Sequence, residues 1–246
     1  MSSVDKGTNR RGLLKGTALL APFAAMAGAG ALAEGRAAAG DPAASAPAPA
    51  TPTVAAYQPM FFSPDEWAFL TAACDRLIPE DEHGPGAVAL GVPQYIDRQM
   101  GTSWADGGNW YMHGPFLEAK PEFGYQSALT PKQQYRLGIK AIDALCRQHF
   151  NSTFAGLQQA AQDDVLRRIE KGELTSEELP LKAFFAGFLL KNTMEGYFGD
   201  PMYGGNRDMA AWAMIRYPGA RADYLEWVGE AKPYPYGPVS LHGDRR

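Results

Sequence analysis

The sequence predicts an all-α fold, and three observations lead to this prediction. Apolar residues recur at spacings of three and four, capping residues precede these segments, and no useful length of chain alternates polar with apolar residues. Of the 246 residues, 46% are hydrophobic and 20% are charged, so the chain can bury a substantial core. We expect a helical domain with long irregular loops over residues 57–230 and a C-terminal tail over 231–246.

The first 33 residues have the features of an export leader. Arg10 and Arg11 precede an apolar stretch from Gly16 to Ala33 that is rich in alanine and glycine. This arrangement is typical of a twin-arginine (Tat) signal, which exports folded proteins, and the small residues before Glu34 offer a cleavage site. An uncleaved membrane anchor is the alternative, although the stretch has few large aliphatic residues. We expect a cleaved signal over residues 1–33, with no membrane span afterwards.

The segment after the leader is dominated by alanine and proline. We therefore expect residues 34–56 to be an extended linker outside the folded domain. Residues 1–33 contain four basic residues and one acidic residue, so their removal changes the formal net charge from −4 to −7. An acidic protein is a poor partner for nucleic acid, which binds clustered lysine and arginine. The five Trp, 11 Tyr and 12 Phe residues suit packed or partner-binding surfaces.

The folded part is expected to begin with a helix from Pro64 to Ile78. Ser63 stands at the capping position, and Glu66 completes a capping box with it. Pro79 ends the helix because proline cannot continue the hydrogen-bond pattern. The apolar stripe that should face the core consists of Trp67, Leu70, Cys74 and Leu77.

A loop, a short helix and a long irregular segment should follow. Three carboxylates beside His83 can form a metal site, but we favour a solvated turn, because acidic residues are common in such loops. The short helix is predicted from Pro93 to Met100. We interpret residues 101–125 as a partner-facing surface, with simple coverage of the core as the alternative. Their aromatic residues are Trp104, Trp110, Tyr111, Phe116, Phe123 and Tyr125.

Three longer helices are predicted in the second half of the chain. Thr130 and Gln133 form a second capping box. A third helix should run from Ala160 to Lys171, and a fourth, the most apolar, from Pro180 to Phe198 after the capping residues Thr175–Glu178. The stripe behind Thr130 consists of Tyr135, Ile139, Ile142, Cys146 and Phe150.

The sequence lacks the motifs of a catalytic cofactor site. Gly28–Ala33 matches a dinucleotide-binding fingerprint, but it lies in the leader and follows no strand. Two cysteines, Cys74 and Cys146, are too few for covalent haem or iron–sulfur ligation, and the histidines show no ligand spacing. We expect no catalytic, cofactor-binding or metal-binding residue in this chain. The two cysteines can form a disulfide in an oxidising compartment or remain buried thiols.

The densest run of unusual residues is the segment Glu195–Asn206, which we name the corner. Here the fourth helix should break at Gly199, and Asn206 can cap a further helix toward Ile215. Glu195 would need hydrogen-bond partners from the turn if it were buried. We favour a rigid joint between two helices over an anion site at the amides near Asn206. Its candidate residues, with one beyond it, are Glu195, Asp200, Pro201, Tyr203, Gly204, Gly205, Asn206 and Trp212.

Taken together, these motifs resemble the gluconate 2-dehydrogenase subunit 3 family, the small or gamma subunit of membrane-bound sugar-acid dehydrogenases. The resemblance covers Phe61 to about Tyr224. It rests on Asp75–Pro79, Gly84–Ala87, Gly91–Val92, Gly114–Pro115, Gly124–Gln126, Thr193–Asn206, Trp212 and Pro218–Gly219. It implies that FAD and haem c belong to partners, a large GMC-type flavoprotein and a multihaem cytochrome c, and that this chain is not catalytic alone.

The resemblance also implies a function. The chain would be the small subunit of a periplasmic, membrane-associated gluconate 2-dehydrogenase-type complex, supporting the flavoprotein's export through the Tat translocase, its maturation and its stability. The leader departs from the usual Tat pattern at Asn9 and Leu13. An independent periplasmic enzyme or small-molecule-binding protein that uses Asp200–Asn206 is the alternative. The loop 101–125 and the corner are the expected interfaces.

Overall fold

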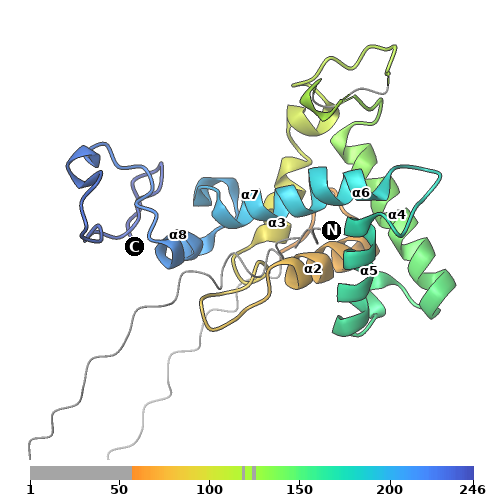
Figure 1. The fold of residues 1–246 in the computed structure, drawn as a ribbon, viewed down its shortest axis with the longest axis horizontal. Coiled ribbons are helices and arrows are strands. Elements are labelled where there is room, and N and C mark those ends of the chain that lie inside the picture. The colour runs from red at the N-terminus through yellow and green to blue at the C-terminus, as the bar shows by residue number, and fades with distance from the viewer. Residues whose placement is uncertain (1–56, 118–119, 124–125) are drawn as a thin grey trace, which may run out of the picture. The chain divides into compact units, whose positions relative to one another are not determined.

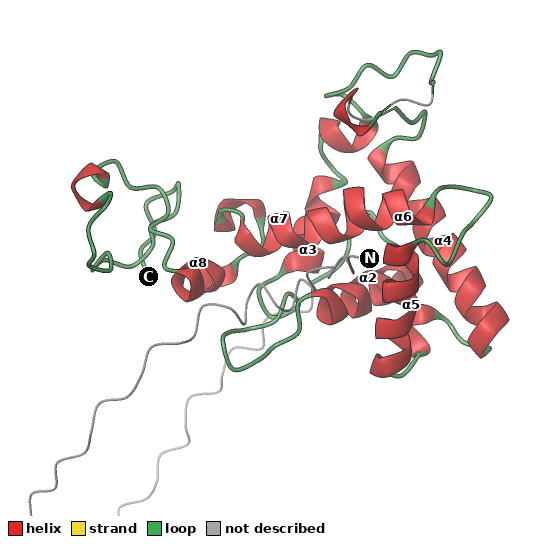
Figure 2. Cartoon of the chain, in the orientation of Figure 1, coloured by secondary structure: helices red, strands yellow, loops and turns green. Residues whose placement is uncertain are grey.

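The structure is a computed structural model, and it describes residues 57–117, 120–123 and 126–246. Within these residues every regular element is a helix, which confirms the all-α prediction (Figures 1 and 2). Extended segments pair there only as isolated bridges. The leader with Arg10 and Arg11 and the linker 34–56 lie outside the described residues.

The first helix, α2 (Pro64–Leu77), begins as the sequence predicts. The Ser63 side chain accepts a hydrogen bond from the Glu66 amide, and the Glu66 carboxylate accepts one from the Ser63 amide. This capping box satisfies two amides that the first turn leaves without helical partners. Leu70 and Cys74 are fully buried, so the predicted stripe faces the core.

The loop after α2 leads to α3 (Val92–Gln99), one residue away from the predicted bounds at each end. The long segment that follows contains two single-turn 3-10 helices, η1 (Ser103–Asp106) and η2 (Pro121–Phe123). Both are too short to be detected from apolar periodicity, which needs several turns.

Helix α4 (Pro131–Phe150) begins directly after Thr130, and Thr130 and Gln133 form the predicted capping box. Four residues of its stripe are buried, but Phe150 is 40% exposed because it lies in the last turn, beyond the core. A 3-10 turn, η3 (Phe154–Gly156), connects α4 to α5 (Gln159–Lys171). The buried Asp143 carboxylate accepts a hydrogen bond from the Phe154 amide and thereby fixes this turn.

The predicted fourth helix is continuous but not uniform. It comprises α6 (Leu181–Phe184), a π-helical segment η4 (Phe185–Leu190) and α7 (Lys191–Phe198), which follow one another in Figure 1. The predicted caps do not cap it, since Ser176 binds the Glu178 amide and the helix begins later. Its buried pairs recur every four residues: Phe184 and Phe185, Phe188 and Leu189, Asn192 and Thr193, Gly196 and Tyr197.

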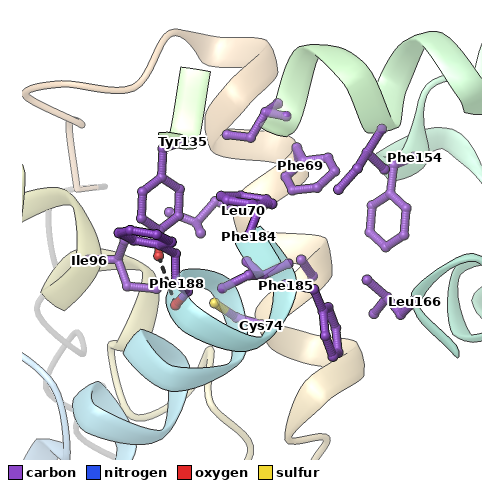
Figure 3. Packing of buried hydrophobic residues seen from close by; sticks show 14 of the residues in the cluster. Phe69, Leu70, Cys74, Ile96, Tyr135, Phe154, Leu166, Phe184, Phe185 and Phe188 are labelled. Carbon is purple, nitrogen blue, oxygen red and sulfur yellow. Dashed lines mark hydrogen bonds between the residues drawn. The ribbon is translucent and has the colours of Figure 1, made fainter. Parts of the chain in front are cut away.

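The π segment follows from this period of four. An α-helix completes a turn in about 3.6 residues, so pairs spaced by four would drift around its surface. The wider turn of η4 absorbs the excess residue and keeps the pairs on the core side. Within the core, Phe184, Phe188 and Tyr135 pack against one another (Figure 3).

Both cysteines of the predicted stripes are buried and free in this structure. The Cys74 sulfur lies 3.6 Å from the Thr193 hydroxyl, and Thr193 donates a hydrogen bond to the Leu189 carbonyl. Burial raises the pKa of the Cys74 thiol to about 12 and that of Cys146 to about 11. Of the two alternatives that the sequence leaves open, the structure contains the buried thiols.

The chain after α7 consists of short elements. These are the 3-10 turns η5 (Pro201–Tyr203) and η6 (Arg207–Met209), then α8 (Ala210–Ile215) and η7 (Leu225–Trp227). The last residues return to this region, since Val239 pairs with Gly219 and with Arg245 in isolated bridges. The segment 231–246, expected to be a tail, therefore packs in part against the chain before it.

Candidate functional site

The predicted partner surface 101–125 is described over residues 101–117 and 120–123, which we name the aromatic loop, and Tyr125 lies outside the described residues. The aromatic loop has an anchored base. Trp104 packs edge-to-face on Trp110, with ring centroids 6.2 Å apart, and lies 6.5 Å from the Phe188 ring of η4. Asp106 accepts a hydrogen bond from Lys132 of α4 at 2.7 Å, and Ala105 is fully buried. The base is therefore fixed to two elements of the core.

The tip of this loop carries large apolar side chains into solvent. Tyr111 is 82% exposed, Phe123 71% and Leu117 67%. Single exposed apolar residues are common, but several on one segment indicate an interaction surface. The described residues thus divide the predicted aromatic set: Trp104 and Trp110 are half-buried supports, whereas Tyr111 is available for contact.

The corner is held against α3 by glycines. A Cβ atom on Gly196 of α7 would lie 2.6 Å from the Tyr95 ring of α3, closer than real contacts allow. A Cβ atom on Gly205 would overlap the carbonyl oxygen of Gly196. Gly204 has a φ of +101°, in the left-handed region that favours glycine. These three glycines let the chain turn back closely over the end of α7.

The polar side chains of the corner bind the chain itself. One Asp200 oxygen accepts a hydrogen bond from the Met202 amide at 3.0 Å, and the other accepts one from the Leu241 amide at 2.8 Å. Asn206 donates to the Gly199 carbonyl and accepts from the Ala211 amide at 3.0 Å, in the first turn of α8, although the residue at the N-cap position of α8 is Met209. These bonds join the end of α7, the start of α8 and the last residues of the chain.

The groups that could form the alternative anion site near Asn206 bind other parts of the chain. The Arg207 amide donates a hydrogen bond to the Leu90 carbonyl at 3.1 Å, and the Arg207 guanidinium donates to the Ala89 carbonyl at 3.2 Å. Because both groups already bind the loop before α3, they are occupied by the protein. This arrangement favours the rigid joint that the sequence indicates.

Glu195 is not buried, so it does not need the turn amides as partners. Its side chain is 42% exposed, and its partners are the Asn192 amide at 2.8 Å and Lys191 at 3.8 Å, both on α7. Turn amides are not among the partners observed for it. The carboxylate avoids burial because it lies on the outer side of the helix, one position before the inward-facing Gly196.

Trp212 of α8 completes the corner. Its indole N–H donates a hydrogen bond to the Phe198 carbonyl at 2.6 Å, at the end of α7, and its ring packs edge-to-face on Tyr217. The bond satisfies a carbonyl that the last turn of α7 leaves without a helical partner. Trp212 is largely buried, whereas Tyr203 is 48% exposed and Met202 42%. Besides Glu195, the exposed residues of the corner therefore lie in η5.

Sequence analysis missed one important residue, Asp97 of α3. Its carboxylate is fully buried, and it accepts hydrogen bonds from the Tyr57 hydroxyl and from the amides of Met60, Phe61 and Phe62, over 2.8 to 3.3 Å. Burial and this hydrogen bond raise the pKa of Tyr57 to about 12. A carboxylate in an otherwise apolar helix face was the available signal, because a buried charge requires partners.

The loop with His83 forms a turn. The Asp81 carboxylate accepts a hydrogen bond from the His83 amide at 2.8 Å, and the His83 side chain is 55% exposed. In the part of the chain that the structure describes, no group of three His, Cys, Asp or Glu residues is placed to hold a metal ion. The same part contains no helix both long and apolar enough to span a membrane.

The protein is thus an all-α domain with two candidate surfaces. One is the aromatic loop, whose base is anchored to the core, and the other is the corner, which is closely packed through its glycines. A family model for gluconate 2-dehydrogenase subunit 3 matches residues 64–219, and the chain belongs to this family. No curated protein matches the chain, and no solved structure matches it. Members of this family are subunits of a dehydrogenase complex. The matched residues include the aromatic loop and the corner.

Proposed function

We propose that this chain is the small, non-catalytic subunit of a periplasmic gluconate 2-dehydrogenase-type complex. In this proposal it binds a large FAD-containing GMC-type subunit, which carries the catalytic chemistry, and supports its export, maturation and stability. A multihaem cytochrome c is the third subunit and attaches the complex to the membrane. The family match supports the assignment to such a complex.

The observation that carries the proposed binding role is the aromatic loop. Its base is fixed by Trp104 and by the Asp106–Lys132 pair, while Tyr111 and Phe123 are largely exposed. Exposed aromatic side chains on a fixed support bury much area on binding and lose little conformational entropy. We assign this loop to the flavoprotein contact.

The proposed export role rests on the leader. Arg10 and Arg11 precede an apolar stretch in the manner of a Tat signal, a route that carries folded proteins. A subunit that carries this signal can take a bound, already folded flavoprotein with it. The proposal therefore connects the leader to the aromatic loop, since co-export requires that the two chains associate before transport.

A double variant, Arg10→Lys with Arg11→Lys, tests the export role. Periplasmic dehydrogenase activity and the location of the flavoprotein should be compared with those of the natural chain. We expect active flavoprotein to remain in the cytoplasm, at unchanged total amount. Lys6→Arg, which leaves the arginine pair intact, is the matched control. Normal export of active flavoprotein in the double variant would contradict the proposal.

A further inference from the structure

The buried Asp97 joins the start of the described chain to the core. The segment Tyr57–Phe62 precedes α2, and one carboxylate on α3 accepts all four hydrogen bonds from it. Asp97 is fully buried, so these donors replace water around the charge. A carboxylate accepts hydrogen bonds only, and the segment presents only donors to it.

Two other helices bind the same segment. Arg136 of α4 donates a hydrogen bond to the Phe61 carbonyl at 2.7 Å, and its guanidinium lies 4.2 Å from the Phe61 ring centre. Tyr57 stacks on Trp67 of α2, with ring centroids 5.4 Å apart. Residues from α2, α3 and α4 thus contact four of the six residues of this segment, Tyr57, Met60, Phe61 and Phe62.

We propose that residues 57–62 form a fold-dependent clasp, with Asp97 as its positioning residue. The clasp closes only when α3 and α4 are assembled beside α2, because its partners come from all three helices. In the folded protein, the chain before Tyr57 therefore leaves from a fixed point. Opening the clasp is a local step that withdraws Phe62 from the Tyr135 ring, on which it packs edge-to-face at 5.6 Å, and leaves the rest of the core in place.

The clasp has a consequence for transport that rests on the proposed export role. If the leader is recognised on folded chains, the clasp matters for transport. Tyr57, where the leader-bearing segment joins the domain, is held in place only after the domain has assembled. The clasp itself does not depend on export. Its test uses the purified full chain without a partner, whereas the export test measures where the flavoprotein is found, so the two proposals can fail separately.

Limited chymotrypsin digestion of the full chain, with products identified by mass, tests the clasp. Chymotrypsin cleaves after aromatic residues, and the exposed Tyr111 and Phe123 serve as internal reference sites. In Asp97→Asn we expect cleavage after Phe61 and Phe62 to accelerate at least ten-fold. The amide nitrogen that replaces one carboxylate oxygen cannot accept the hydrogen bonds which that oxygen receives from the segment. Cleavage at the two reference sites should not change.

Two further variants keep the test decisive. Tyr57→Phe removes one hydrogen bond and retains the ring on Trp67, so it should fold and should accelerate cleavage after Phe61 and Phe62 several-fold. Asp164→Asn, at an exposed carboxylate of α5, is the matched control and should have no effect. Unchanged cleavage in both clasp variants would overturn the proposal. A parallel increase at Tyr111 and Phe123 would also overturn it, since Asp97 would then support only the global fold.

Discussion

Gly205 packs directly against the backbone of Gly196, so that any side chain on Gly205 would overlap the Gly196 carbonyl oxygen. This contact closes the corner over the end of α7. The obstacle is backbone rather than the flexible end of a side chain, so it cannot move aside without shifting the helix. The tolerance of these two positions to substitution is therefore the most direct test of the corner as a rigid joint.

We expect Gly205→Ala and Gly196→Ala each to lower the free energy of unfolding by about 1–3 kcal/mol, the usual cost of overpacking. Thermal or denaturant unfolding followed by circular dichroism measures this change. Gly187→Ala is the control, because a Cβ atom there meets nothing within 4 Å. It should raise stability by about 0.5–1 kcal/mol, as glycine is a poor helix residue. Equal stability of all three variants would refute the packing argument.

The buried hydroxyl of Tyr135 should contribute measurably to stability. It donates a hydrogen bond to the Asn192 side chain at 2.9 Å, and burial raises its pKa well above the ordinary value. Tyr135→Phe leaves the Asn192 oxygen without this donor, so we expect a loss of about 1–2 kcal/mol in unfolding free energy. Tyr111→Phe, at an exposed ring, should change stability by less than about 0.5 kcal/mol. A neutral Tyr135→Phe would show that the bond contributes nothing net.

The cysteine thiols should be unreactive in the folded chain. Burial raises the pKa of Cys74 from 9.0 to about 12, so the reactive thiolate is rare at neutral pH. Folding thus favours the protonated thiol, and this contribution to stability is complete below pH 9 and lost as the pH rises toward about 12. A thiol-specific reagent should label both cysteines only after unfolding. A mass lower by two hydrogen atoms would instead indicate a disulfide.

The aromatic loop should decide binding without affecting folding. Tyr111→Ser and Phe123→Ser remove exposed rings, so unfolding temperatures should stay within the error of the natural chain. Affinity for the flavoprotein, measured by co-purification or calorimetry, should fall about ten-fold or more for each, as expected for central aromatic contacts. Tyr236→Ser, at a 61% exposed ring in the C-terminal segment, is the control. Unchanged affinity in both loop variants would move the interface elsewhere, with exposed Tyr203 the next position to change.

Asp200 should hold the C-terminal residues in place. Asp200→Ala removes the acceptor of both the Met202 and Leu241 amides, so we expect about 1–3 kcal/mol of destabilisation. Hydrogen exchange should show faster exchange of the Leu241 amide. Asp223→Ala, at an exposed carboxylate, should leave both measurements unchanged. If a chain shortened to residue 238 were as stable as the full chain, the Leu241 contact would be dispensable.

The parts of the fold that the sequence predicted are local. Ser63 and Glu66, or Thr130 and Gln133, are three residues apart, and the capping box depends only on that spacing. The Gly172 end of α5 is equally local, since it requires one left-handed residue. The starts of α2 and α4 and the end of α5 were therefore accessible within one or two residues, whereas the π-helical segment η4 was not.

The parts that the sequence did not predict depend on distant partners. Asp97 binds residues 35 to 40 positions away, so no local pattern connects it to Tyr57. Phe150 matched the apolar stripe of α4 but lies beyond the core. Periodicity identifies which face of a helix is buried, but not how far along the helix the core extends. The corner was found through its glycines, while its attachment to Leu241 required the folded chain.

The π-helical turn of η4 bears on how sequences of this kind can be aligned. Each α-helical residue rotates the helix face by about 100°, so deletion of one residue between 185 and 190 would convert the wide turn to ordinary geometry and turn α7 about its axis. Gly196 would then leave Tyr95, and Asn192 would leave Tyr135. A single-residue gap at this place in a related chain thus marks a protein in which the contact between α3 and α7 must be built from different residues.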